Sequence, residues 1–411
     1  MTVAAVLPSR KTRWVRTHRM SVLVYRFSIW LVFVGSALAG PLSRLQFGPI
    51  SAQGVLTLAL ALLSSCLLAT SWPSSYWACR ALRPLILVTC WIFLSFLWSD
   101  QFSIGSQNAL VFFTFAAFLF LSLRYAGFVA DLPLRVARLL EISTVVAASL
   151  YGLSVAWWGL GTDVIWGNRT FAMFSLLGLG WFLAGWRHGR RSFLWISIGV
   201  SLIIALSLSR AAFLVATLLY PVSQLLGTGW KRFARTAVAL IVCSGILILS
   251  LQVLEPFRGR FTGGGSLDDI LASNAAMYTS GRVNLWTQTF ASALESPWIG
   301  KGAGSASAFV AATFGDIEHP HNDYLRVFHD YGAVGLFLFL VSLMYLIRAC
   351  WRNWSGAVDV FEARLGLASL LGLLSAVMMM LTDNTLDYVF VMAPLGVLVG
   401  TALGSPQRRR T

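Results

Sequence analysis

The 411-residue chain has little charge and little cysteine. Only 11% of its residues are charged while 57% are hydrophobic, and a soluble domain of this size could not cover so much apolar surface. The composition therefore predicts a polytopic membrane protein. Its five cysteines lie in or beside apolar runs and form no C-x-x-C pair, so neither a disulfide framework nor a cysteine zinc site is expected. The chain also has no internal repeat and no low-complexity tract.

Apolar runs long enough to cross a bilayer recur along the whole chain. We expect an all-α membrane protein with about twelve transmembrane helices, near 21–39, 50–70, 84–99, 107–123, 139–159, 170–186, 192–208, 211–227, 236–254, 333–349, 364–382 and 387–404. The organisation follows from this count: residues 1–254 hold spans one to nine, 255–332 form a long loop, and 333–411 hold the last three spans and a basic tail.

The basic residues give this topology a direction. Of the 31 lysines and arginines, 22 fall on the side of the two termini, eight fall on the other side, and Arg26 lies within the first span. Positively charged loops stay in the cytoplasm, so both termini should be cytoplasmic and the long loop should lie outside. The net charge of +15 then reflects topology, and no nucleic-acid partner is expected. The basic N-terminus and the run at 22–39 also suit a signal peptide, but the many downstream spans favour a retained helix.

A dense polar cluster at 318–335 ends the outer loop and runs directly into an apolar span. It contains three of the five histidines, and polar groups beside a membrane span are usually kept for function. Its histidines and main charged side chains are His319, His321, Asp323, Arg326, His329 and Asp330.

Three outer features could meet in space: Arg210 between the seventh and eighth spans, Arg282 in the long loop, and the His319-Pro-His321 turn. Arginine binds phosphate oxygens with a planar fork, and histidine can take up a proton near neutral pH. Two arginines and a histidine therefore suit a phosphate or pyrophosphate substrate. An alternative remains open for each residue. Arg210 could be a cation at a helix end whose side chain extends to the membrane–water interface. Arg282 could be a solvated loop residue, and His321 could be a helix-start residue that is hydrogen-bonded to the backbone.

Two weaker signals lie nearby. The H-x-H-x-D spacing with Glu318 could hold a divalent cation, but the ligand set is sparse and we expect no metal and no other cofactor. The sequence GKGAG at 300–304 lacks the spacing of a phosphate-binding P-loop and is better explained as an ordinary turn.

Four motifs follow one another in order: S-G-R-x-x-x-W, P-x-x-G-x-G, H-x-H-N-x-x-L and G-x-x-G entering a span. Here they begin at Ser280, Pro297, His319 and Gly332, and the Ser209-Arg210 step and the Trp98-Ser99-Asp100 sequence fit the same pattern. In this order and membrane placement they resemble the O-antigen ligase and polymerase superfamily.

The resemblance implies a GT-C-like fold with a periplasmic loop between helices 9 and 10, in a bacterial inner membrane. It implies an inverting, metal-independent glycosyltransferase that uses undecaprenyl-pyrophosphate-linked glycans. The acceptor would be lipid A core, a growing O-antigen or exopolysaccharide, or a protein. The catalytic residues would be His321, Arg282 and Arg210, and the expected substrate-binding residues are Arg169, His319, Asn322, Tyr324, Arg326 and Lys301.

The competing class is a twelve-helix secondary transporter or an exporter of lipid-linked glycans. Ion-coupled carriers usually need ionisable groups near the midplane, and the predicted spans hold almost none besides Arg26. Carriers built from two six-span halves also tend to have their long loop inside after span six, whereas the long loop here is outside after span nine. Both features favour the transferase.

Overall fold

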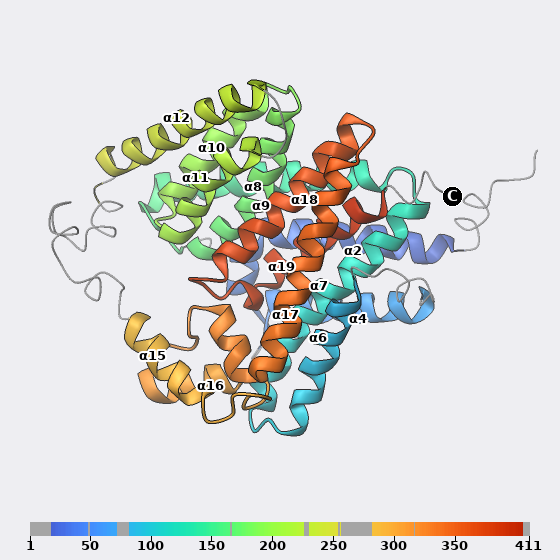
Figure 1. Ribbon diagram of the computed structural model, residues 1–411, viewed down its shortest axis with the longest axis vertical. Coiled ribbons are helices and arrows are strands. Elements are labelled where there is room, and N and C mark those ends of the chain that lie inside the picture. The colour runs from blue at the N-terminus through green and yellow to red at the C-terminus, as the bar shows by residue number, and fades with distance from the viewer. Residues whose placement is uncertain are drawn as a thin grey trace, which may run out of the picture.

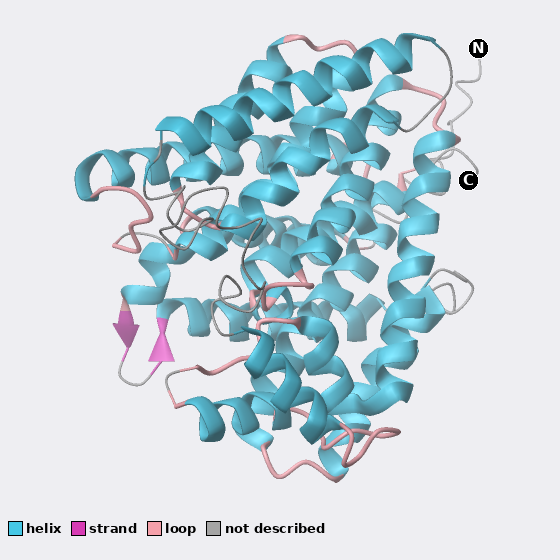
Figure 2. Cartoon of the chain, turned by 60° about the vertical axis from the view of Figure 1, so that its left-hand side comes forward, coloured by secondary structure: helices cyan, strands magenta, loops and turns pink. Residues whose placement is uncertain are grey.

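The computed structural model describes residues 18–47, 50–71, 82–164, 167–225, 230–253, 255, 282–315 and 317–405 (Figure 1). These residues form a helix bundle with one small antiparallel strand pair, β1 (Gln46–Phe47) and β2 (Ile50–Ser51), seen in Figure 2. The helices are α2 (Arg19–Ala37), α3 (Ala39–Arg44), α4 (Ala52–Ser71), α6 (Arg83–Leu94), α7 (Phe102–Phe128), α8 (Leu132–Trp158), α9 (Asn168–Arg187), α10 (Ser192–Leu206), α11 (Arg210–Leu225), α12 (Trp230–Val253), α15 (Arg282–Ala293), α16 (Ser305–Phe314), α17 (Asp323–Ser355), α18 (Val360–Met379) and α19 (Val389–Gly404), with 3₁₀ turns η2 (Ser95–Leu97) and η4 (Thr385–Asp387).

Each of the twelve predicted spans coincides with a helix, and the prediction of an all-α polytopic membrane protein is supported. Among the described residues, seven helices are long and apolar enough to cross a membrane: α2, α4, α7, α8, α12, α17 and α18. Helices α6, α10, α11 and α19 are apolar but shorter. The count of twelve spans and the three-region organisation stay predictions.

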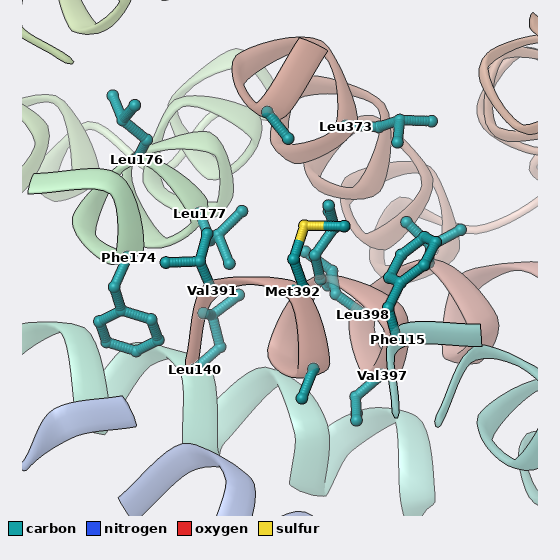
Figure 3. Packing of buried hydrophobic residues seen from close by; sticks show 14 of the residues in the cluster. Phe115, Leu140, Phe174, Leu176, Leu177, Leu373, Val391, Met392, Val397 and Leu398 are labelled. Atoms are coloured by element: carbon teal, nitrogen blue, oxygen red, sulfur yellow. The ribbon is translucent and has the colours of Figure 1, made fainter. Parts of the chain in front are cut away.

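Helix α19 lies at the centre of the bundle. Figure 3 shows Val391 and Met392 of α19 packed among Leu140 of α8, Leu177 of α9 and Leu373 of α18. Its face toward α7 is built from glycines four residues apart. A Cβ atom at Gly396, Gly400 or Gly404 would lie 2.5, 2.2 or 2.2 Å from backbone oxygens of α7, so only glycine permits this close approach.

Helix α17 is bent at Gly332, whose φ of 66° lies in the left-handed region. A Cβ there would lie 2.3 Å from the Trp298 carbonyl oxygen, so the position requires glycine for space as well as for its backbone angle. The bend separates the polar residues 323–331 from the apolar rest of the helix. The polar segment and the predicted apolar span are therefore two parts of one kinked helix.

The described part of the predicted outer loop folds against this polar segment. Helices α15 and α16 pack on α17 and on each other, at the end of the bundle seen at the bottom of Figure 1. Ser280, where the S-G-R-x-x-x-W motif begins, lies outside the described residues, and α15 is described from Arg282 onward.

Candidate active site

The turn that carries His321 is fixed from both sides. Trp286 of α15 donates its ring N–H to the Pro320 carbonyl oxygen over 2.8 Å. Asn322 caps α17: its side-chain oxygen accepts a hydrogen bond from the Leu325 amide over 3.0 Å. His321 lies between these two anchors and is half-buried.

Backbone strain occurs at two places in this region. Among the described residues, only Leu208 and His321 combine a side chain with a positive φ, 56° and 51°. Leu208 lies in the three-residue link between α10 and α11, two residues before Arg210. Such strained positions cluster at functional sites, where the surrounding structure holds them in place.

Three arginines stand at helix starts and interact electrostatically at the candidate site. Arg210 and Arg282 are the first residues of α11 and α15, and Arg169 is the second residue of α9. Arg282 donates to the Thr382 carbonyl oxygen over 2.7 Å. Burial lowers the pKa of Arg282, the Asp383 carboxylate opposes this, and the charges of Arg169 and Arg210 lower it further. The three positive charges therefore interact with one another, and the positive ends of their helices add to the positive potential at this place.

Two of these arginines, Arg169 and Arg282, also act on His321. Burial lowers the pKa of His321 to about 4, and the charges of Arg169, Arg282 and His319 contribute in that order, with Asp387 opposing them. The imidazole is therefore uncharged at neutral pH. Arg282 and Arg169 therefore both act on the His-Pro-His turn, and Arg210 acts on Arg282, so the predicted meeting of all three features stays a prediction.

The sequence reasoning missed a third component, the link between α18 and α19. His321 Nδ1 lies 3.1 Å from Asn384 Nδ2 and 4.0 Å from Asp383 Oδ1. Asp383 is 3% exposed, and its burial raises its pKa against the opposing charge of Arg169. Asp387 Oδ2 lies 3.7 Å from His319 Nδ1. One signal for this link was available: residues 383–387 contain two acids between two apolar runs on the outer side of a chain that has few acids.

The remaining predicted binding residues differ in placement. His319 stays beside His321, is 30% exposed, and lies 3.0 Å from Ser307 Oγ. Arg326 is buried and binds the carboxylates of Asp323 and Asp387. Arg326 therefore ties α17 to the α18–α19 link, which is a positioning role.

Tyr324 and Lys301 also contact protein groups. Tyr324 donates its hydroxyl to the Val377 carbonyl oxygen over 2.9 Å. Lys301 binds Glu295 over 2.7 Å and Ser292 over 2.9 Å. Together with the capping residue Asn322, these side chains are engaged by the fold, and their direct contact with a substrate stays a prediction.

The GKGAG turn is structural, as the sequence indicated. The amides of Lys301 and Gly302 donate to backbone oxygens of α17 over 2.9 Å each, and the Gly304 amide donates to the Asp330 carboxylate over 3.2 Å. These amides are therefore not available to a phosphate. Asp330 also accepts from the Ala306 amide over 2.7 Å, which places a carboxylate at the start of α16.

The residues of the weakly predicted metal site are divided among other partners. Asp323 accepts from the Leu386 amide over 2.9 Å and binds Arg326. Within the described ranges, no group of three histidine, cysteine, aspartate or glutamate side chains is placed to hold a metal ion.

Comparison with protein families identifies the segment that carries most of this geometry. Residues 193–340 match the family model described as O-antigen ligase. This segment of the chain is similar to O-antigen ligases. The match confirms the resemblance to the O-antigen ligase and polymerase superfamily, and the matched segment includes Arg210, Arg282, His319 and His321. A search of curated proteins finds no match to the chain. This similarity indicates lipid-linked glycans and their acceptors as the general substrate class.

Proposed function

We propose that the protein is a glycosyltransferase of the bacterial inner membrane. It transfers an oligosaccharide from undecaprenyl pyrophosphate to an acceptor hydroxyl at the periplasmic face. The observation that carries this proposal is the placement of Arg169 and Arg282 beside an uncharged His321, with Arg210 acting on Arg282, and the O-antigen ligase match points to this substrate class.

The arginines would bind the pyrophosphate. When the acceptor oxygen attacks the anomeric carbon, the bond from that carbon to the pyrophosphate oxygen breaks, and the electron pair leaves with the phosphate. Negative charge therefore grows on the leaving group during the reaction. Guanidinium groups already fixed there stabilise the transition state more than the ground state. Attack from the face opposite the leaving group inverts the anomeric configuration, and the arginines supply the charge that a metal ion provides in other transferases.

His321 would accept the proton of the attacking hydroxyl. Its Nδ1 faces the Asn384 amide, and no described residue donates a hydrogen bond to Asn384 Oδ1. With this amide turned by 180°, Oδ1 accepts the proton of Nδ1, and Nε2 becomes the free base. A positioned general base of this kind contributes roughly 10²–10⁴ in rate.

The test is transfer in vitro from a purified undecaprenyl-pyrophosphate donor to a defined acceptor. His321→Ala and Arg282→Ala should each abolish transfer while the protein stays folded. Full activity in both variants would refute the assignment of the site.

The acceptor class can be read from a deletion strain. Single repeat units left on the lipid A core indicate a polymerase, and complete loss of core-attached glycan indicates a ligase. Both outcomes should be accompanied by accumulated lipid-linked donor. A deletion strain with unchanged surface glycans and no such accumulation would favour a solute transporter.

The placement of the site can be tested by cysteine labelling in a background without the native cysteines. Glu295 is well exposed near the site, and Gly189 lies in an open turn at the other end of α9. A cysteine at position 295 should react with an impermeant reagent added to the periplasm, and one at position 189 should not. The reverse result would invert the topology.

A further inference from the structure

A second basic pocket lies at the end of the bundle opposite His321. It has a volume of about 390 Å³ and is formed by α8, α9, α18 and the turn after α9. Arg364 lines it from the start of α18. The last residue of this helix, Met379, lies roughly 22 Å away along the helix axis and is followed by the link that holds Asp383. No step of the proposed transfer reaction involves this pocket.

The pocket holds an excess of positive charge. Of the described residues that line it, three are arginines, Arg138, Arg190 and Arg364, and one is an acid, Glu141. Two further acids, Asp359 and Glu362, stand at the start of α18 but do not line the pocket. Among the described lining residues, positive charge therefore exceeds negative charge by two.

Arg364 is the most informative residue of the pocket because it is buried with incomplete hydrogen bonding. It is 6% exposed, and no described residue accepts a hydrogen bond from its Nε or Nη2. The Glu141 carboxylate lies 3.8 Å from Nη2, beyond hydrogen-bond distance. The guanidinium instead lies 3.5 Å from the centre of the Trp181 ring and 4.3 Å from that of Phe193. Burying such unsatisfied donors is costly, so an anion with oxygen acceptors would be bound favourably.

The mouth of the pocket indicates where this anion comes from. Leu134 and Ile142 of α8 line it and are 45% and 60% exposed, and Val145 continues the same exposed apolar face at 43%. Helix α8 is one of the helices long and apolar enough to span a membrane, so this face suits acyl chains. A phosphate among the arginines and acyl chains along α8 match the two parts of an anionic phospholipid.

We propose that this pocket binds the phosphate group of an anionic phospholipid from the membrane leaflet opposite the active site. The lipid bridges α8, α9 and α18, the helices that support Arg169 and Asp383 at their other ends. The proposal does not depend on the transferase activity.

The experiment uses the purified full-length protein in a neutral detergent. Bound lipid is counted by native mass spectrometry, and thermal unfolding is followed during titration with phosphatidylglycerol, phosphatidylcholine of the same acyl chains, or inorganic phosphate. Phosphatidylglycerol should bind and raise the unfolding temperature more than the other two.

Arg138→Gln and Arg190→Gln are the test variants, because both side chains are exposed and their loss should leave the fold intact. Each should weaken phosphatidylglycerol binding about fivefold, as expected for one arginine facing a lipid phosphate. Arg348→Gln removes the same charge from an exposed position of α17 outside this pocket, and should bind like the wild type.

Three results would overturn the proposal. Equal binding of phosphatidylcholine would show that the phosphate charge is not recognised. If Arg348→Gln weakened phosphatidylglycerol binding as much as the two pocket variants, the binding would reflect general attraction between the lipid and the positively charged surface. An equal response to inorganic phosphate would assign the pocket to a soluble anion rather than a lipid.

Discussion

The most direct consequence of the site geometry is an acid-tolerant reaction. A general base works only when neutral, and burial together with Arg169 and Arg282 lowers the pKa of His321 to about 4. Protonation should therefore inactivate the free enzyme only near pH 4, well below the unperturbed histidine pKa of about 6.5.

The size of the effect is large enough to measure. At pH 5.5, about 97% of an imidazole with a pKa of 4 is neutral, against about 9% for an unperturbed histidine. The value of kcat/KM at pH 5.5 should therefore stay close to its value at pH 7.5, whereas an unperturbed base would lose about tenfold. The profile of kcat/KM is the right measurement because it reports the ionisation of the free enzyme.

Arg169→Gln tests the cause of this shift. Removing a nearby positive charge makes protonation easier, so the pKa of His321 should rise and the acid limb should move to higher pH. Arg44→Gln is the matched control, because Arg44 is exposed near the same end of the bundle and binds the Asp163 carbonyl oxygen. A wild-type profile that is half-maximal near pH 6.5, or equal shifts in both variants, would refute the electrostatic argument.

Three further predictions concern the same region. Arg282→Lys keeps the charge but loses the fork that reaches both Thr382 and an anion, so transfer should fall roughly ten- to hundredfold at normal protein levels; unchanged activity would make Arg282 structural. His319→Ala should be milder than His321→Ala and activity should survive EDTA, whereas equal losses and inhibition by EDTA would indicate a metal site. Gly332→Ala should lower the midpoint of thermal unfolding at least about 3 °C more than Gly189→Ala does. Both glycines have a positive φ, but only Gly332 has no room for a Cβ atom, so equal effects would contradict this steric reason.

The helices were predictable from hydropathy because a bilayer fixes the length of an apolar run. The ends of the helices were harder to predict. Helix α8 begins at Leu132, seven residues before the predicted span, since Arg135 and Arg138 interrupt the apolar run without interrupting helical hydrogen bonding. Helix α17 likewise begins at Asp323, ahead of the predicted start at 333, because the bend at Gly332 joins a polar helix to an apolar one.

The site was predictable only where its residues belong to local motifs. His321 and Arg282 stand in the ordered motifs of the outer loop, and Arg210 stands out as a charge between two apolar runs. The contact of His321 with Asp383 and Asn384 joins positions more than 60 residues apart. Hydropathy marks 383–387 only as a short link between spans, and no local pattern says which loop it meets.

The missed acids explain how the arginine cluster can exist before substrate arrives. Burial lowers the pKa of Arg282 most, and the charges of Arg169 and Arg210 lower it further, so the three guanidinium groups repel one another. The Asp383 carboxylate opposes that shift, so it offsets part of the repulsion. Burial nevertheless raises the pKa of Asp383, which means that its charge is only partly stabilised by the arginines. The cluster therefore keeps a net positive charge that its own acids do not neutralise. A bound pyrophosphate would supply the negative charge that offsets the arginines. When the bond to the sugar breaks, the pyrophosphate gains negative charge, and the excess positive charge of the cluster would stabilise it.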